Sequence, residues 1–223
     1  MSAPEFKGEL LYKKESSNIY DSKGDLIASI GTEKRQIVTY EELPQVLIDA
    51  IVATEDSRFF EHDGFDIYRF MKAGVGFLKG EDAGGASTLT MQLSKNTYTS
   101  TNTKGFDGIV RKFTDIYMSI FKIEKDYSKE QIIEFYVNAP YLGAGSYGVQ
   151  MASRTYFDKD ITDINLVEAA MIAGLFQAPG EYDPYVNPDK TNERKNEVIN
   201  LMLRHGYITE EEMNAVLEIP IES

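Results

Sequence analysis

The chain of 223 residues has no cysteine, no tryptophan and only two histidines. The first absence excludes disulfides and thiolate metal sites, and two histidines exclude a metal site built from several imidazoles. No apolar run approaches the ~20 residues of a membrane span, and no signal peptide opens the sequence. Basic residues are also few: 23 Lys and Arg against 36 Asp and Glu give a formal charge of −13, which argues against a nucleic-acid partner.

What is present is a globular balance of 42% hydrophobic and 26% charged residues, which argues against disorder. The charge is unevenly spread. Residues 91–125 hold six basic and three acidic side chains, a balance of +3 that leaves −16 for the rest of the chain. A basic segment in an acidic protein suggests a local anionic ligand, although a solvated helix face is the more ordinary explanation.

The apolar pattern predicts one β-hairpin followed by helices. Residues 18–21 and 26–30 alternate around a turn signal at 22–24. After Pro44 the apolar spacing becomes helical, and only helices and loops are expected from there to the end. Further helices are predicted after a capping box at Ser128–Gln131, over 166–176, over 192–204 and after Thr209. The predicted fold class is therefore mainly α with a small N-terminal hairpin.

Two adjacent carboxylates, Glu55 and Asp56, follow an apolar helix and precede Phe59 and Phe60. A carboxylate against aromatic surface can serve as a general acid or base, whereas the ordinary alternative is an acidic pair at a solvated helix end. His62 stands close to further carboxylates, which could suggest a metal site. A hydrogen-bonded structural histidine is the commoner case.

A Gly pair leads to Ser87, a plausible N-cap, and the helix expected after it places Thr88, Gln92 and Lys95 on one face. Hydroxyls, an amide and a lysine at a helix N-terminus suit an oxyanion or phosphate, and an ordinary amphipathic helix is the alternative.

Arg111 and Lys112 precede Asp115, which shares a helix face with Arg111. These residues suit either a pyrophosphate held beside a carboxylate or a surface ion pair worth ~0.3–0.5 kcal/mol.

A fourth segment interleaves Tyr136, Tyr141 and Tyr147 with glycines between residues 143 and 148. Aromatic faces and close backbone approach suit a sugar-binding groove. A tightly packed loop between helices explains the same pattern about equally well.

The order and wording of these segments resemble the peptidoglycan glycosyltransferase domain of class A penicillin-binding proteins and of monofunctional peptidoglycan glycosyltransferases (glycosyltransferase family 51). The resemblance runs over roughly 20–208. The matching stretches are 55–64 (EDSRFFEHDG), 85–96 (GASTLTMQLSKN), 111–115 (RKFTD), 133–138 (IEFYVN) with Tyr141 and 143–149 (GAGSYGV), and 168–175 (EAAMIAGL) with Pro179.

The resemblance implies a lysozyme-like, bilobed helical domain over 17–223, with a smaller membrane-proximal lobe at about 62–110. Residues 1–16 are expected to be a tail or linker, with 1–6 partly a cloning remnant. No Lys-Thr-Gly motif occurs, so no transpeptidase domain is expected. The chain is expected to be soluble without its anchor. In a full-length protein it would work on the extracytoplasmic face of the bacterial cytoplasmic membrane, with 65–78 touching lipid.

The implied reaction polymerises lipid II. The acceptor 4-hydroxyl attacks the anomeric carbon of the growing glycan chain, undecaprenyl pyrophosphate leaves, and the linkage inverts to β-1,4. Glu55 would be the general base, and Asp115 the second catalytic carboxylate. Asp56, Phe59, His62 and Gly64 would support the first motif. The resemblance assigns substrate and pyrophosphate binding to Ser87, Thr88, Gln92, Lys95, Asn96, Arg111, Lys112, Asn138, Tyr141 and Tyr147. Moenomycin-type inhibitors are expected to bind the same site.

Two departures from the family pattern bear on activity. Asp115 stands where the family has glutamate, which shortens the reach by a methylene, and a displacement of this order can cost ~10²-fold in rate. Met91 stands where glutamine is common and removes a potential hydrogen bond to substrate. No organic cofactor is expected. A divalent cation, Mg²⁺ or Mn²⁺, is left open, with Asp115 as its candidate ligand.

Two other functions compete with polymerisation. One is a catalytically impaired lipid II-binding domain, weakened by Asp115. The other is a lysozyme-like muramidase, which the basic motifs disfavour because cleavage of an uncharged glycosidic bond needs no pyrophosphate clamp.

Overall fold

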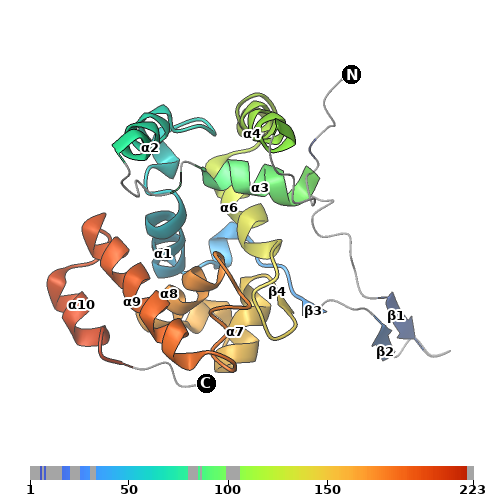
Figure 1. Cartoon of the computed structure of the whole chain (residues 1–223). Coiled ribbons are helices and arrows are strands. Elements are labelled where there is room, and N and C mark those ends of the chain that lie inside the picture. Colours follow the sequence, from blue (N-terminus) through green and yellow to red (C-terminus); the bar gives the residue numbers. More distant parts are fainter. Residues whose placement is uncertain are drawn as a thin grey trace. The chain divides into compact units, whose positions relative to one another are not determined.

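The computed structural model describes residues 6, 8, 17–20, 26–30, 34–79, 85, 87–98 and 106–219. The chain is mainly helical, as predicted (Figure 1). It divides into two compact units. Unit 1 consists of 1–6 and 55–136, and unit 2 of 7–54 and 137–223. Unit 1 thus extends beyond the 62–110 segment expected for the smaller lobe. None of the helices in the described residues combines the length and apolar content that a bilayer crossing requires.

Unit 2 begins with the predicted hairpin. Its strands β1 (Ser17–Tyr20) and β2 (Leu26–Ile30) pair antiparallel. A second pairing was not predicted: β3 (Lys34–Arg35) runs parallel to β4 (Ser146–Tyr147). The expectation of only helices and loops after Pro44 is therefore wrong at β4, since two residues are too few for an alternating pattern.

The rest of unit 2 is mainly helical. Its helices are α1 (Gln45–Glu55, whose last residue falls in unit 1), α7 (Val149–Phe157), α8 (Leu166–Leu175), α9 (Pro188–Arg204) and α10 (Glu210–Val216), with 3-10 turns η2 (Tyr40–Glu42) and η5 (Ile161–Asp163). α8 is buried along nearly its whole length. A Cβ on Gly174 would lie 2.9 Å from Arg194 Cγ, so glycine there lets α8 and α9 pack closely. α9 starts four residues before the predicted helix because Pro188 suits the first helical turn.

Unit 1 holds most of the segments that carry chemistry. Its elements are η3 (Phe59–Glu61), α2 (Ile67–Lys79), α3 (Leu89–Tyr98), α4 (Phe106–Met118), the π-helix η4 (Ser119–Ile123), α5 (Glu124–Asp126) and α6 (Lys129–Asn138, whose last two residues fall in unit 2). The predicted capping box is confirmed: Ser128 N donates to Gln131 Oε1, and Gln131 N donates to Ser128 Oγ.

Phe6 packs against unit 1. Its side chain is buried against the rings of Tyr127 and Phe135 at 5.4 and 6.0 Å. The Tyr127 hydroxyl donates to the Phe6 carbonyl oxygen. Phe6 is therefore part of the folded unit, and residues 1–5 lie outside the described part of the chain.

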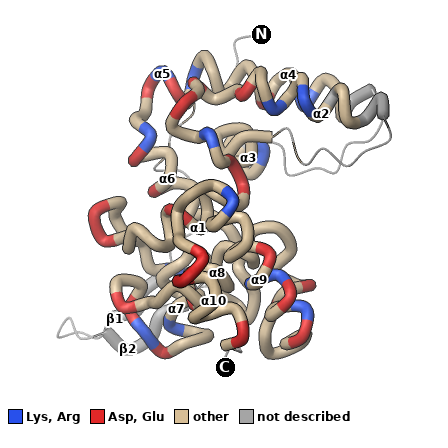
Figure 2. Tube along the Cα trace, turned by 90° about the vertical axis from the view of Figure 1, so that its left-hand side faces the viewer, with Lys and Arg blue, Asp and Glu red and all other residues tan. Residues whose placement is uncertain are grey.

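Lys and Arg stand on both α4 and α9, and each helix also carries acidic residues (Figure 2). On α4 they are Arg111 and Lys112 of the basic segment 91–125, with Asp115 on the same helix. The basic segment lies entirely within unit 1.

Candidate active site

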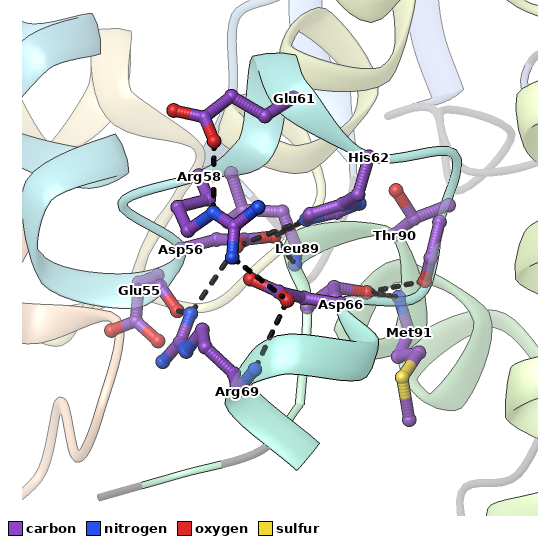
Figure 3. A network of polar contacts seen from close by, with 12 residues as sticks. Glu55, Asp56, Arg58, Glu61, His62, Asp66, Arg69, Leu89, Thr90 and Met91 are labelled. Carbon is purple, nitrogen blue, oxygen red and sulfur yellow. Dashed lines mark hydrogen bonds and ion pairs between the residues drawn. The ribbon is translucent and has the colours of Figure 1, made fainter. Parts of the chain in front are cut away.

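Glu55 is the last residue of α1, where the helix ends and the chain turns toward η3. Its Oε2 accepts a hydrogen bond of 2.8 Å from Gln92 Nε2 on α3. Its carbonyl oxygen accepts one of 3.0 Å from Arg69 Nη1 on α2 (Figure 3). The side chain is partly exposed, so the carboxylate is both anchored and reachable.

Asp56, next in the chain, has the opposite role. Its side chain is fully buried and accepts from His62 Nε2, Arg69 Nη1 and the backbone N–H of Leu89, at 3.0–3.2 Å (Figure 3). The bond from Leu89 fixes the first turn of α3 beside the end of α1. Asp56 thus ties three segments together, and the interpretation of His62 as a structural histidine is supported by its bond to Asp56.

Asp56, His62 and Asp66 place ligand atoms within 4.8 Å of one another. Two guanidinium groups already face this cluster, with Arg69 3.2 Å from Asp56 and Arg58 3.5 Å from Asp66. The two cations balance the two carboxylates, so the cluster is a poor site for a further cation.

Two aromatic residues, Phe59 and Phe60, and one glycine, Gly64, complete the first motif. Phe59 is buried and lies under Lys129 Nζ, 4.3 Å from the ring centre, whereas Phe60 is half exposed. Gly64 has a φ of +82°, and a Cβ there would lie 2.9 Å from the backbone of Ser119 in η4. Both the left-handed backbone and the close approach require glycine.

The start of α3 differs from the prediction. The helix begins at Leu89, and Thr88, not Ser87, is its N-cap: Thr88 Oγ1 accepts from Met91 N at 3.2 Å and donates to Gly64 O at 2.7 Å. Thr88 is fully buried, so its hydroxyl is used within the fold and is not a substrate contact. Met91 is 2% exposed, so the thioether fills the core and replaces no substrate contact.

The basic residues and Asp115 gather on α3 and α4. Lys112 Nζ donates to Ser87 Oγ, and Asp115 Oδ1 accepts from the buried Ser94 at 3.3 Å. Burial raises the pKa of Asp115, and the Ser94 hydrogen bond and the charges of Arg111, Lys112 and Lys95 oppose that rise. Burial lowers the pKa of Lys112, and Asp115 opposes that fall.

This arrangement suits an anion better than a metal. Three cations influence the one carboxylate of Asp115, and a divalent ion prefers several oxygen ligands. Asp115 as it stands therefore does not fit the divalent cation left open from the sequence. Lys95 and Asn96 are exposed at the C-terminal part of α3, where a ligand can reach them.

Three predicted site residues belong to unit 2. Asn138 is fully buried, and its side-chain amide accepts from Val38 N at 3.0 Å and donates to Val38 O at 2.7 Å. Its amide is therefore occupied within the fold, which is a correction to its predicted substrate role. Tyr141 and Tyr147 lie 5.2 Å apart, with Tyr141 exposed and Tyr147 partly exposed, and their rings remain able to meet a ligand.

A comparison with protein families now decides the identity. The sequence model described as transglycosylase matches residues 23–203. This chain belongs to the transglycosylase family. The match starts within the N-terminal hairpin and ends in α9, and so includes every candidate site residue named above.

Curated relatives of this chain are penicillin-binding proteins 1A. The protein from Streptococcus oralis is 39% identical over 221 residues, which is 99% of this chain and 34% of the relative. The one from Aquifex aeolicus is 38% identical over 93% of this chain and 28% of the relative. The crystal structure of penicillin-binding protein 1A from Haemophilus influenzae is similar with a TM-score of 0.54 and 29% identity, covering 94% of this chain and 21% of that one. The chain thus spans about a third or less of these relatives.

The chain also exposes apolar side chains along α2 and along α4 and η4 of unit 1. On α2 they are Ile67, Tyr68, Phe70, Met71 and Val75, and along α4 and η4 they are Ile109, Val110, Phe113, Tyr117 and Phe121. The α2 set falls in the stretch expected to touch lipid. The side chains of Phe77 and Leu78 in the same stretch are not among those that the structure describes. The α4 set was not predicted, although its i, i+4 spacing was legible in the sequence.

Three functional positions were missed or misplaced in the sequence. Arg69 donates to Asp56 and Ser94 donates to Asp115, and no local sequence motif marks Arg69 or Ser94. Tyr136, expected in a sugar groove, is 4% exposed, and its hydroxyl donates to Gln92 Oε1 at 3.1 Å. The partners in these three bonds are 13, 21 and 44 residues apart in the sequence, so only the fold reveals them.

Proposed function

We propose that this domain is a peptidoglycan glycosyltransferase that polymerises lipid II into β-1,4-linked glycan strands. One observation carries the proposal: Glu55 ends a helix with one carboxylate oxygen anchored by Gln92, in the same compact unit as a cationic group formed by Lys95, Arg111 and Lys112. Inverting transfer from a pyrophosphate donor needs both parts, a base for the acceptor and cations for the leaving group.

In this scheme Glu55 accepts the proton of the acceptor 4-hydroxyl as that oxygen bonds to the anomeric carbon of the donor. The bond from the anomeric carbon to the pyrophosphate oxygen breaks, and its electron pair leaves with undecaprenyl pyrophosphate. Lys95, Arg111 and Lys112 stabilise the developing negative charge. In this proposal Ser87 and Asn96 contact the same leaving group or the adjoining sugar. Sugar contacts by Tyr141 and Tyr147 stay a prediction, since aromatic faces suit sugar rings.

The exposed faces of α2 and α4 support work at a lipid surface, since a lipid-linked substrate must be taken from a membrane. Apolar side chains gathered on an exposed helix face suit partial burial among lipids. We place the domain at the extracytoplasmic face of the bacterial cytoplasmic membrane. No organic cofactor enters this scheme.

The test is polymerisation of labelled lipid II in detergent, with Mg²⁺ or Mn²⁺ supplied for the substrate pyrophosphate. We expect polymer from the parent and at least a hundredfold less from Glu55→Gln, because the amide cannot accept the proton. Glu61→Gln is the matched control, since this carboxylate is 63% exposed on η3 and should leave the rate unchanged. Soluble fragments released from finished glycan by the parent would instead identify a muramidase.

Asp115 calls for its own comparison. It is buried and hydrogen-bonded to Ser94, so it is held in place by the fold, as a working carboxylate must be. If it is a weak substitute for glutamate, Asp115→Glu should raise the rate. A domain that binds lipid II or moenomycin but makes no polymer, with either residue at 115, would be a binding module and not an enzyme.

A further inference from the structure

The geometry around Glu55 points to a further role for two residues. We infer that Tyr136 and Gln92 form a positioning relay that anchors Oε2 of Glu55 and leaves Oε1 for the acceptor hydroxyl. This inference rests on the proposed function. It moves Gln92 from the predicted substrate contacts to the support of the base, and it gives Tyr136 a role that its sequence motif does not suggest.

The two oxygens of the Glu55 carboxylate have different surroundings. Gln92 Nε2 donates to Oε2 at 2.8 Å. Among the described residues of unit 1, none donates to Oε1. A base that must take a proton from a bound hydroxyl needs one oxygen fixed and the other open, and Glu55 has this arrangement.

The relay depends on the orientation of the Gln92 amide. A glutamine side chain can present either its N–H₂ or its carbonyl oxygen to a neighbour. Tyr136 donates its hydroxyl to Gln92 Oε1 at 3.1 Å, while Gln92 Nε2 donates to Glu55, so both ends of the amide are bonded in the orientation that faces the N–H₂ group toward Glu55. In the opposite orientation the carbonyl oxygen would face an anionic carboxylate, which is repulsive.

The relay also requires that the Tyr136 hydroxyl keeps its proton. Tyr136 is 4% exposed on α6, and the pKa of its hydroxyl is well above its ordinary value because of burial, with the charges of Glu55 and Asp56 adding to the rise. The hydroxyl therefore stays protonated over the neutral pH range and remains a donor. When Glu55 takes up the acceptor proton on Oε1, both bonds of the relay persist unchanged.

The relay is also held in register by its surroundings. Asp56 Oδ2 accepts from Leu89 N at 3.0 Å, which fixes the start of α3 to the residue that follows Glu55. Gln92 lies one turn beyond Leu89 on the same helix. A rigid frame of this kind holds a reacting group to the sub-ångström tolerance that catalysis requires.

Steady-state kinetics of lipid II polymerisation test the role. We expect Gln92→Leu to lower kcat about tenfold to a hundredfold and Tyr136→Phe about twofold to tenfold, each with KM nearly unchanged. The double variant should match Gln92→Leu alone, because Tyr136 acts through Gln92. Tyr127→Phe, which loses a hydroxyl elsewhere in unit 1, is the control and should keep the parent kcat. A raised KM with an unchanged kcat in Gln92→Leu would return Gln92 to the substrate contacts and overturn the relay.

A second measurement is independent of activity. In protein labelled with ¹⁵N-glutamine, the Gln92 side-chain amide is assigned from its loss in Gln92→Leu. We expect its resonance to shift in both Tyr136→Phe and Glu55→Gln and to stay in place in Tyr127→Phe, with thermal unfolding showing that each variant is folded. An unmoved resonance in the first two variants overturns the relay. A parent that makes no polymer while the resonance shifts overturns the proposed function and leaves the relay as a structural one.

Discussion

The two units of the domain differ in the apolar side chains that they expose. Both units bury apolar residues, as helix α8 of unit 2 does from Val167 to Leu175. Both also bury polar residues, such as Asp56 in unit 1 and Gln150 in unit 2. Unit 1 in addition leaves apolar side chains such as Phe113 and Met71 on the surface of α4 and α2. The difference teaches that unit 1 combines a buried polar network with an apolar face turned outward.

Several buried polar groups of unit 1 are joined in hydrogen-bond networks. Thr90 Oγ1 donates to Glu124, which also pairs with Lys129 at 2.8 Å. Such networks specify one geometry when satisfied and are costly when broken. A unit built in this way suits a site that must hold charged groups in fixed positions, at the expense of tolerance to substitution.

The largest expected effects come from substitutions in the buried interior of each unit. Asp56→Asn removes the charge that three donors share, and we expect it to lower the free energy of unfolding by about 3–5 kcal/mol. Ile172→Ala opens a cavity in α8 and should cost about 2–5 kcal/mol. Urea unfolding measures both, and amide hydrogen exchange locates them.

The helix that loses hydrogen-exchange protection should differ between the two variants. Protection should fall in α3 for Asp56→Asn and in α8 for Ile172→Ala. Equal loss of protection in both helices for either variant would show that the two units share one cooperative structure, and the contrast drawn between them would be wrong.

The next largest effect concerns the exposed apolar side chains of α4. Phe113 is 68% exposed on α4, so Phe113→Ser should change the stability by no more than about 0.5 kcal/mol. Binding to phosphatidylcholine vesicles should weaken about tenfold, since an aromatic side chain no longer transfers into lipid. Neutral lipid is chosen because the chain carries a charge of −13.

Val186→Ser is the matched control for the vesicle experiment. Val186 is 67% exposed in unit 2, and we expect its replacement to leave vesicle binding unchanged. Vesicle sedimentation of parent and variants measures both. Equal weakening by the two substitutions would mean that the α4 face has no special affinity for lipid.

The sequence predicted elements better than partners. The hairpin, α1, α8 and the capping boxes of α6 and α10 followed from local patterns, because caps and apolar spacing act within a few residues. β4 and the burial of Thr88, Met91 and Asn138 did not follow, because each depends on contacts distant in the chain. Asn138, for example, is matched with Val38, 100 residues earlier.

The site shows the same division. The motifs singled out Glu55, Lys112 and Asp115, since residue type and spacing report the chemistry directly, and the structure shows that all three lie in one unit. The resemblance assigned Gln92 to the substrate, because its partners Glu55 and Tyr136 are 37 and 44 residues away. Residue type thus pointed to the candidate site, and only the fold shows which members support the others.

The smallest effect concerns the charge of Asp115 within the polar interior of unit 1. Burial raises the pKa of Asp115 above its ordinary 3.8, so the native state keeps this proton to a higher pH than the unfolded chain. Stability from this group is full below pH ~4 and is lost as the pH rises through the native pKa. Asp115→Asn lacks that loss. The Tm of this variant, relative to the Tm of the parent at the same pH, should therefore rise from pH 3.5 to pH 7. Ser94→Ala removes a hydrogen bond that opposes the shift, and its loss of Tm over the same range should exceed the parent's. Thermal unfolding across this range decides the sign, and a Tm of Asp115→Asn that falls relative to the parent would mean that the fold stabilises the ionised carboxylate.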